Sequence, residues 1–211
     1  MYLFTRVRTA RSSRIRDAMA FAREARDFVN EHTDLNVSLH ATVLGRPVGT
    51  LTWAALVEGR ANVADAQVAL MANPDYLAMV ERGGELFESN GDDFLRQIIQ
   101  MNGIGPDQEP PACSQGWSAQ IANGQYDHAT AWAIDIAEYV AGLTGVGIAT
   151  LTDSYGQFGT ITWVGALDSA QHADTVNELL VADAEWVKRL NYAEDLFIPG
   201  SGRVWLNRRL D

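Results

Sequence analysis

Apolar and polar residues alternate along Tyr2–Arg8, along Val37–Leu44 and again along Val48–Leu56. Such alternation, with a period of two, is typical of strands that bury one face. Between the first two of these stretches, apolar residues recur at helical spacing from Ile15 to Val29. The pattern therefore predicts that the chain opens with a strand, an amphipathic helix of about 18 residues and a two-stranded hairpin.

Similar patterns predict the remaining elements. The further helices are expected at 62–71, 74–82, 127–140, 169–181 and 183–190, and the further strands at 94–100, 117–122, 146–153, 157–166 and 203–209. The order is β-α-β-β-α-β, with an extra short helix before the last strand, and it occurs twice. The side chains expected to cap helices at their N-termini are Ser12 or Ser13, Asp127, and Asp168 or Ser169.

One pentamer occurs twice in the chain with a single conservative change. Gly49–Trp53 reads Gly-Thr-Leu-Thr-Trp, and Gly159–Trp163 reads Gly-Thr-Ile-Thr-Trp, 110 positions later. The offset continues without a gap and places Tyr76 on Trp186. A fixed offset over so long a stretch is evidence of tandem duplication. The predicted organisation is a first repeat at 1–100, a linker rich in proline and glycine at 101–114, and a second repeat at 115–211.

A β-α-β-β-α-β half made twice in one chain resembles the dimeric α+β barrel superfamily, in which two ferredoxin-like sheets pair and close a barrel, usually between two subunits. The Trp that ends the third strand resembles the NIPSNAP-type and antibiotic-biosynthesis-monooxygenase-type families. So do the stretches Asn73–Tyr76 and Ala182–Trp186, which open the short helices. The resemblance implies an α+β fold of two ferredoxin-like βαββαβ repeats that pair as an intramolecular pseudo-dimeric α+β barrel. It implies no single function, because the superfamily includes monooxygenases, haem enzymes, isomerases and proteins of unknown role.

Composition narrows the class of protein. A hydrophobic fraction of 47% in 211 residues is enough for two sizeable cores. The net charge of −11 argues against a nucleic-acid partner and against an anionic membrane surface. No run approaches the roughly 18 apolar residues of a membrane span. Cys113 is the only cysteine, which suits a reducing compartment, so we expect a soluble, acidic, cytoplasmic protein.

Neither a metal nor a haem cofactor is expected from the sequence. The four histidines are His32, His40, His128 and His172. None is spaced from another His, Cys, Asp or Glu as metal ligands usually are. The resemblance implies that a haem-degrading member would offer a His near the short helix. The short helices of this chain offer Tyr76 and Trp186 instead.

The hairpin loop Gly45–Pro47 fixes a register for the two strands on either side. Centring the hairpin on its middle residue pairs His40 with Thr52 and Leu39 with Trp53. One face is then polar and the other apolar, and this agreement supports the register.

Polar side chains from the first half are expected to converge on one face of the first sheet. In ferredoxin-like order the first strand lies beside the third, so Arg6, Thr52 and His40 should form a row facing the barrel interior, with Thr50 nearby. One interpretation is a satisfied hydrogen-bond network that joins two sheets. The other is a small-molecule site in which His40 acts as acid or base and Arg6 holds an anionic group. Thr50 and Thr52 would then contact the ligand.

The two repeated tryptophans, Trp53 and Trp163, also allow two interpretations. They are either core anchors on the face of the sheet that carries the helices, or walls of a ligand pocket between sheet and helices.

Two functional hypotheses therefore stay open. The first is an enzyme or binder of a small organic molecule that acts in a barrel cavity without a metal or haem cofactor. The second is a non-catalytic structural or assembly subunit built on a fused pseudo-dimer, which needs a flat apolar outer patch. A homo-oligomer is compatible with either hypothesis.

Overall fold

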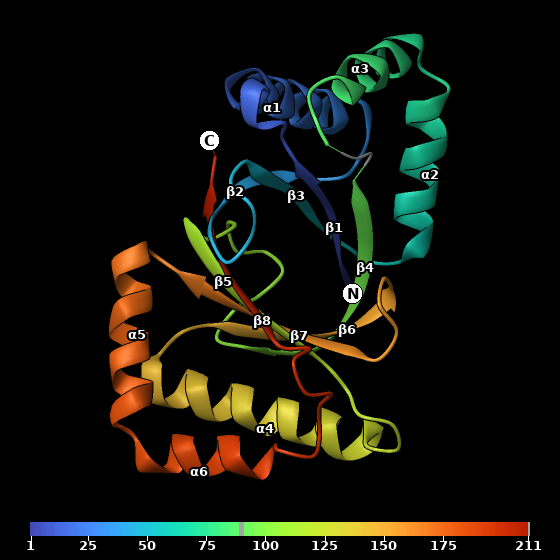
Figure 1. The fold of residues 1–211 in the computed structure, drawn as a ribbon. Helices are drawn as coiled ribbons and strands as arrows, with labels where there is room; N and C mark the ends of the chain where they lie inside the picture. The colour runs from blue at the N-terminus through green and yellow to red at the C-terminus, as the bar shows by residue number, and fades with distance from the viewer. Residues whose placement is uncertain (89–90, 211) are drawn as a thin grey trace. The chain divides into compact units, whose positions relative to one another are not determined.

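The computed structural model describes residues 1–88 and 91–210. They divide into two compact units, of which unit 1 comprises 1–96 with 208–211 and unit 2 comprises 97–207. In each unit, helices cover one face of the strands (Figure 1). Among the described residues, no helix combines the length and the apolar character needed to cross a membrane.

The elements of the first repeat follow the predicted order closely. They are β1 (Tyr2–Thr9), α1 (Ile15–His32), β2 (Ser38–Leu44), β3 (Thr50–Val57), α2 (Arg60–Met71), α3 (Pro74–Gly84) and β4 (Asp92–Asn102). A 3-10 turn at Ser12–Arg14 precedes α1, and α1 begins without a side-chain cap. The prediction that Ser12 or Ser13 caps this helix is therefore wrong, because both residues belong to the preceding turn.

The second repeat contains the same elements. They are β5 (Cys113–Gln120), α4 (Tyr126–Thr144), β6 (Ile148–Tyr155), β7 (Thr160–Leu167), α5 (Ala170–Ala182), α6 (Ala184–Tyr192) and β8 (Arg203–Arg209). Ser169 caps α5 as predicted, since its side chain accepts a hydrogen bond from the main-chain nitrogen of His172 at 3.1 Å. The predicted cap by Asp127 is wrong, because that residue lies inside the first turn of α4.

β5 begins at Cys113, four residues before the predicted strand. Its first part, Cys113–Gly116, has no apolar alternation, and Gly116 stands where a side chain would overlap the indole ring of Trp205. The connection between β4 and β5 is correspondingly short and comprises residues 103–112.

The strands follow one hydrogen-bonded order, β1-β3-β2-β8-β5-β7-β6-β4, which closes into a barrel. Within the repeats, β3 pairs antiparallel with both β1 and β2, and β7 pairs antiparallel with both β5 and β6. The predicted fold class is confirmed: an α+β fold with two ferredoxin-like βαββαβ repeats in an intramolecular pseudo-dimeric α+β barrel. The register predicted for the first hairpin is also confirmed, since His40 lies opposite Thr52 and Leu39 opposite Trp53.

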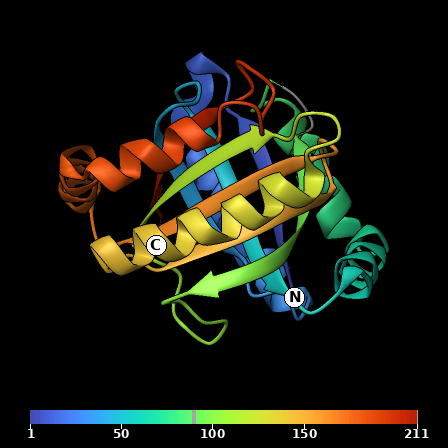
Figure 2. The ribbon, with the colours of Figure 1, turned by 90° about the horizontal axis from the view of Figure 1, so that it is seen from below.

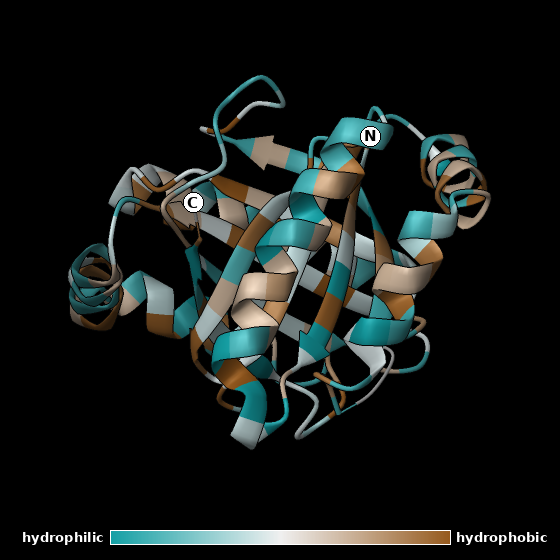
Figure 3. Ribbon diagram, turned by 90° about the horizontal axis from the view of Figure 1, so that it is seen from above, coloured by the Kyte–Doolittle hydropathy of each residue, from teal (hydrophilic) through white to brown (hydrophobic). Residues whose placement is uncertain are grey.

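Small residues allow the long helix of each unit to lie close to its sheet. Ala18 and Ala22 of α1 are completely buried, as are Ala129 and Ala133 of α4. With only a methyl group at these positions, the helix backbone approaches the strands closely. Figure 2 shows α4 (yellow) lying along the strands of unit 2, and Figure 3 shows hydrophilic and hydrophobic residues mixed along the helices.

The chain returns to unit 1 after β8. The main-chain nitrogen of Leu210 donates a 2.8 Å hydrogen bond to the carbonyl oxygen of Leu39 in β2. The carbonyl oxygen of Leu210 accepts a 3.0 Å hydrogen bond from the guanidinium of Arg26 in α1. Unit 1 is therefore built from two segments that are distant in sequence.

Candidate functional site

The predicted site residues of the first sheet lie on two different faces. Arg6 lies directly opposite Trp53, and the indole nitrogen of Trp53 donates a 3.1 Å hydrogen bond to the carbonyl oxygen of Ala22 in α1. Arg6 is therefore on the face that carries the helices. His40 and Thr52 lie opposite one another on the other face.

The predicted row of Arg6, Thr52 and His40 is consequently wrong. β1 places Val7, not Arg6, opposite Thr52. Leu3 and Val7 are apolar, so alternation by itself favours placing them towards the helices and Arg6 on the opposite face. An arginine stem is also largely apolar, and a long cationic side chain can line an apolar space with its stem.

On the face without helices, His40 is buried and electrically neutral at neutral pH. Burial, with a smaller contribution from Arg209, lowers the pKa of His40 to about 4. Its Nε2 lies 2.9 Å from the hydroxyl oxygen of Ser38, and that hydroxyl donates to the carbonyl oxygen of Ala54 at 3.1 Å. The proton of the neutral ring therefore resides on Nε2, and Nδ1 carries a lone pair.

Nδ1 of His40 and the hydroxyl oxygen of Thr52 are buried on this face, and neither has a hydrogen-bond partner within the described part of the chain. Thr50 differs, because its hydroxyl donates to the carbonyl oxygen of Pro47 at 2.7 Å and lies 3.2 Å from the hydroxyl of Thr9. Only part of the predicted polar network is therefore satisfied.

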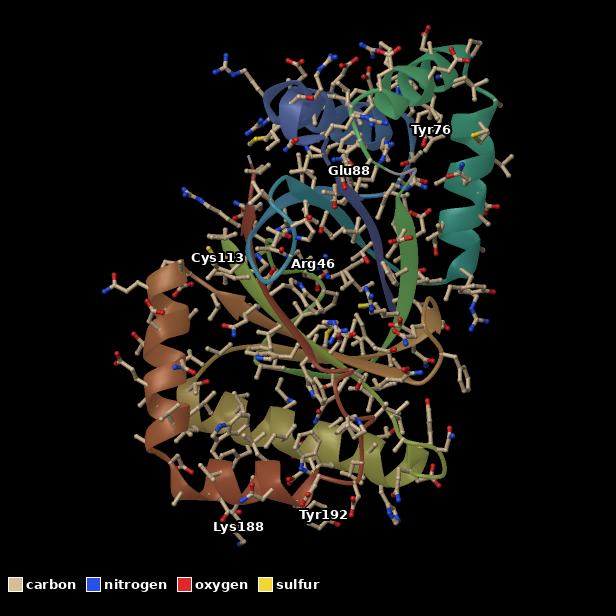
Figure 4. All side chains as sticks on the ribbon, in the orientation of Figure 1. Arg46, Tyr76, Glu88, Cys113, Lys188 and Tyr192 are labelled. Atoms are coloured by element: carbon tan, nitrogen blue, oxygen red, sulfur yellow. The ribbon has the colours of Figure 1, made fainter. Side chains whose placement is uncertain are left out.

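Unit 1 contains a pocket of about 100 Å³ between its sheet and its helices. Its polar lining includes Arg6 and Arg8 from β1 and Tyr76 from α3 (Figure 4), while most of the wall is apolar. Arg6 makes a two-point ion pair with Asp93, with Nε–Oδ1 at 2.7 Å and Nη2–Oδ2 at 2.6 Å. Trp53 forms part of the wall.

The two arginines of the unit 1 pocket experience opposite electrostatic effects. The hydrogen bond to Asp93 raises the pKa of Arg6 above its ordinary value, against the effect of burial, and Tyr76 adds to the rise. Burial, and then the neighbouring charge of Arg6, lower the pKa of Arg8. The guanidinium of Arg8 also lies 4.1 Å from the ring centre of Phe87, a favourable cation–π distance.

Unit 2 contains a larger pocket, of about 260 Å³, at the corresponding place. Four of the six tryptophans of the chain line it: Trp117, Trp132, Trp163 and Trp186. Its polar lining consists of two neutral amides, those of Gln115 and Asn177. No charged side chain is among its lining residues.

Two of these indoles already use their N–H groups. Trp163 donates to the carbonyl oxygen of Ala133 at 2.9 Å, and Trp132 donates to that of Arg189 at 3.1 Å. The two rings meet edge to face, with centres 6.0 Å apart and planes at 88°. These two rings therefore offer the pocket apolar surface, and the two amides and the indoles of Trp117 and Trp186 supply its hydrogen-bonding groups.

The two pockets are related by the repeat. Trp163 corresponds to Trp53, and Trp186 corresponds to Tyr76. Trp117 lies opposite Trp163 as Arg6 lies opposite Trp53. Trp53 and Trp163 were expected to be either core anchors or pocket walls. Each is hydrogen-bonded to a helix and also borders a pocket, so both descriptions fit where the rings lie. Their binding of a ligand stays a prediction.

Several pocket residues escaped sequence reasoning. They are Arg8, Trp117, Trp132 and, as pocket walls, Tyr76 and Trp186, and the ion-pair partner of Arg6, Asp93, was missed as well. The offset that pairs Tyr76 with Trp186 was a usable signal, because it marks the same position in both repeats. Within 1–88 and 91–210, no three His, Cys, Asp or Glu side chains gather in a way that could hold a metal ion.

Solved structures with the same fold cover almost the whole chain. A candidate monooxygenase from Fusobacterium nucleatum has a TM-score of 0.72 at 7% identity, over 100% of this chain and 92% of that one. An anthrone oxidase-like protein has a TM-score of 0.71 at 10% identity, over 100% and 91%. A ferredoxin-fold protein from Listeria monocytogenes, related to antibiotic biosynthesis monooxygenases, has a TM-score of 0.53 at 8% identity, over 99% and 95%.

Neither a family model nor a curated protein sequence matches the chain. At the identities above, the likeness to solved structures concerns the fold alone. The chain has the fold of the dimeric α+β barrel superfamily, with two ferredoxin-like repeats in a single polypeptide.

Proposed function

We propose that this protein binds a small, flat, mainly apolar organic molecule in the unit 2 pocket. The observation that carries the proposal is the wall of four tryptophans around an uncharged space of about 260 Å³. This volume lies just below the usual range of ligand pockets, roughly 300–1,000 Å³. Aromatic side chains bury much surface and favour flat partners, which they meet by stacking or edge to face.

The lining also indicates how such a molecule would be oriented. The N–H groups of Trp132 and Trp163 are used by helix carbonyls. The other polar groups of the lining are the amides of Gln115 and Asn177, which can each donate and accept, and the indole N–H groups of Trp117 and Trp186, which can donate. A ligand with a single hydroxyl or carbonyl group on an aromatic body fits this arrangement.

The wider form of the proposal is that the bound molecule is also transformed, without a metal or haem cofactor. Support comes from similar folds described as a candidate monooxygenase and as anthrone oxidase-like. The roles predicted for His40 and Arg6 in such a reaction stay predictions, as do the ligand contacts predicted for Thr50 and Thr52. Arg6 lies beside the other pocket, in unit 1.

Calorimetric titration with 2-naphthol, a flat two-ring alcohol, tests the binding proposal. We expect saturable binding to the wild type and binding at least tenfold weaker to Trp186→Ala, a loss of roughly 1.4 kcal/mol. Tyr192→Ala is the matched control, because Tyr192 is an exposed aromatic residue on the same helix (Figure 4). No binding to the wild type, or equal loss in both variants, would contradict the proposal.

One observation favours the alternative of an assembly subunit. Three exposed apolar positions recur at the repeat offset: Met71 and Val181, Leu77 and Val187, Val80 and Leu190. Apolar residues kept exposed in both repeats suit an interface between copies. Under this alternative the protein self-associates as its concentration rises, and Val187→Glu returns it to a monomer. Sedimentation that stays monomeric at all concentrations would remove the alternative.

A further inference from the structure

We propose that Tyr139 and Asp183 are positioning residues for the unit 2 pocket, because the hydrogen bond between them holds Trp186 in place as a wall against which the ligand packs. The inference rests on the ligand-binding role proposed above for this pocket, and it adds what keeps the pocket in shape. Neither side chain is among the residues that line the pocket, so both would act through Trp186.

Asp183 joins two helices of unit 2 through a single carboxylate oxygen. Its Oδ1 accepts a 2.5 Å hydrogen bond from the hydroxyl of Tyr139, on α4, and a 2.8 Å hydrogen bond from the main-chain nitrogen of Trp186, on α6. Asp183 is the N-cap of α6, so the position of its carboxylate determines where the first turn of that helix lies. The hydroxyl of Tyr139 therefore fixes, through one atom, the main chain that carries the Trp186 indole.

The ionisation of the two groups suits this bond. The hydrogen bond from Tyr139 is the main cause that lowers the pKa of Asp183 below its ordinary value, so the carboxylate is ionised at neutral pH. The same bond raises the pKa of Tyr139 to about 12, so the phenol keeps its proton. A protonated donor and an ionised acceptor form a charge-assisted hydrogen bond, which is stronger than a bond between neutral groups.

Polar contacts matter for α6 because little of this helix is withdrawn from water. None of its residues, all of which the structure describes, is buried, whereas α3 of unit 1 buries Tyr76 and Met79. Trp186 and Leu190 of α6 nevertheless form part of the pocket wall. A helix with few buried apolar side chains opens more readily than the core around it. The wall supplied by α6 is therefore the part of the pocket that needs to be held.

Further contacts between α6 and α4 (Figure 1) hold the other end of the short helix. The indole nitrogen of Trp132 donates to the carbonyl oxygen of Arg189 at 3.1 Å, and the guanidinium of Arg189 pairs with Asp135. Arg189 belongs to the last turn of α6, whereas Trp186 accompanies the cap at its beginning. The Tyr139–Asp183 bond is thus the contact that acts directly on the turn carrying the pocket wall.

The two repeats differ at the donor of this hydrogen bond. Ala22 and Ala133 accept the hydrogen bonds from the repeated tryptophans. At the same spacing further along the two long helices lie Phe28 and Tyr139. Phe28 has no hydroxyl group to donate, and it stacks instead on Tyr76, with ring centres 6.1 Å apart. The aromatic wall is therefore held by ring stacking in unit 1 and by a hydrogen-bonded cap in unit 2.

Calorimetric titration with 2-naphthol tests the inference on the whole protein. Tyr139→Phe keeps the ring and removes only the donor, and we expect binding about three- to tenfold weaker than that of the wild type. Tyr126→Phe is the matched control, because Tyr126 is exposed on the same helix and outside the pocket, and this variant should bind like the wild type. If Tyr139→Phe binds as well as a wild type that does bind, the inference is overturned and the proposed function stands. If the wild type does not bind, both are overturned.

A second measurement reports the position of Trp186 without any ligand. Quenching of tryptophan fluorescence by acrylamide is compared between each protein and the same protein carrying Trp186→Phe, so that the difference isolates Trp186. Tyr139→Phe should increase the quenching of Trp186, and Tyr126→Phe should leave it unchanged. Unchanged quenching of Trp186 in Tyr139→Phe overturns the inference even if ligand binding is weaker, because the hydroxyl would then act by another route.

Discussion

The indole nitrogen of Trp163 donates a 2.9 Å hydrogen bond to the carbonyl oxygen of Ala133, in the middle of α4. Trp53 makes the same bond to Ala22 in α1, at 3.1 Å. In each unit, one side chain therefore fixes the long helix to the sheet and also forms part of a pocket wall. The ring cannot rotate without losing this bond, so each pocket has a rigid side.

This bond leads to a prediction about stability. Trp163→Phe keeps an aromatic ring but removes the donor, and we expect the free energy of unfolding to fall by about 1 kcal/mol. Trp163→Ala should cost more, about 3–5 kcal/mol, because it also leaves a cavity. Urea denaturation measures both changes. Equal stability of the wild type and Trp163→Phe would show that the hydrogen bond contributes nothing.

The close packing of Gly116 under Trp205 can be tested with a single methyl group. A Cβ atom at position 116 would overlap the indole ring of Trp205, so Gly116→Ala should lower the free energy of unfolding by about 1–3 kcal/mol. Gly142→Ala is the control, because this glycine lies in α4 with open space around its Cβ position. That change should stabilise the protein by roughly 0.5–1 kcal/mol. A higher melting temperature for Gly116→Ala than for Gly142→Ala would contradict the close packing of Gly116 against Trp205.

The buried histidine makes a prediction about pH. His40 has a pKa of about 4 in the folded protein, below the ordinary value of 6.5 that applies when the chain is unfolded. Between these values the unfolded chain binds a proton that the folded protein does not, so stability falls as the pH drops from 6.5 towards 4. The loss due to this group should be about 3 kcal/mol.

The wild type and His40→Gln should be compared by urea denaturation across this pH range. Carboxylates contribute to the pH dependence of both proteins, so the difference between the two curves isolates His40. We expect the wild type to lose more stability than the variant on acidification. Parallel curves would mean that His40 is exposed to water or shares its proton with another group.

His40→Ala separates the two functional hypotheses drawn from the sequence. If His40 acts as acid or base on a molecule bound beside it, turnover of that molecule should cease while the protein stays folded. If the residue is only structural, about 1–3 kcal/mol of stability should be lost through its stranded partners, with ligand binding unchanged. Thermal melts and ligand titrations on this variant distinguish the two results.

The fold could be predicted from the sequence because the spacing of apolar residues and the 110-residue repeat indicate the same order of strands and helices. The Gly45–Pro47 loop set the β2–β3 register, and the structure has that register. The face of β1 could not be predicted in the same way. Leu3 and Val7 are apolar and are the expected choice for the face that carries the helices. Arg6 and Arg8 line the apolar pocket there with their long aliphatic stems, and Asp93 pairs with the charge of Arg6.

The candidate site was predicted only in part, for a related reason. Trp53 and Trp163 stand out because they recur at a fixed offset. Trp117 lies on β5 and Trp132 on α4, whereas Trp163 lies on β7, and the approach of all three depends on strand pairing and on how α4 packs on the sheet. Packing of this kind leaves no periodic trace in one sequence.

The return of Leu210 to Leu39 affects how the chain acquires its structure during synthesis. Proteins emerge from the ribosome N-terminus first. The carbonyl group of Leu39 therefore has no hydrogen bond from Leu210 until all of residues 97–207 have been translated. During that interval the nascent first unit has an incompletely paired strand, the kind of edge that attracts other strands. β2 therefore completes its pairing only at the end of synthesis.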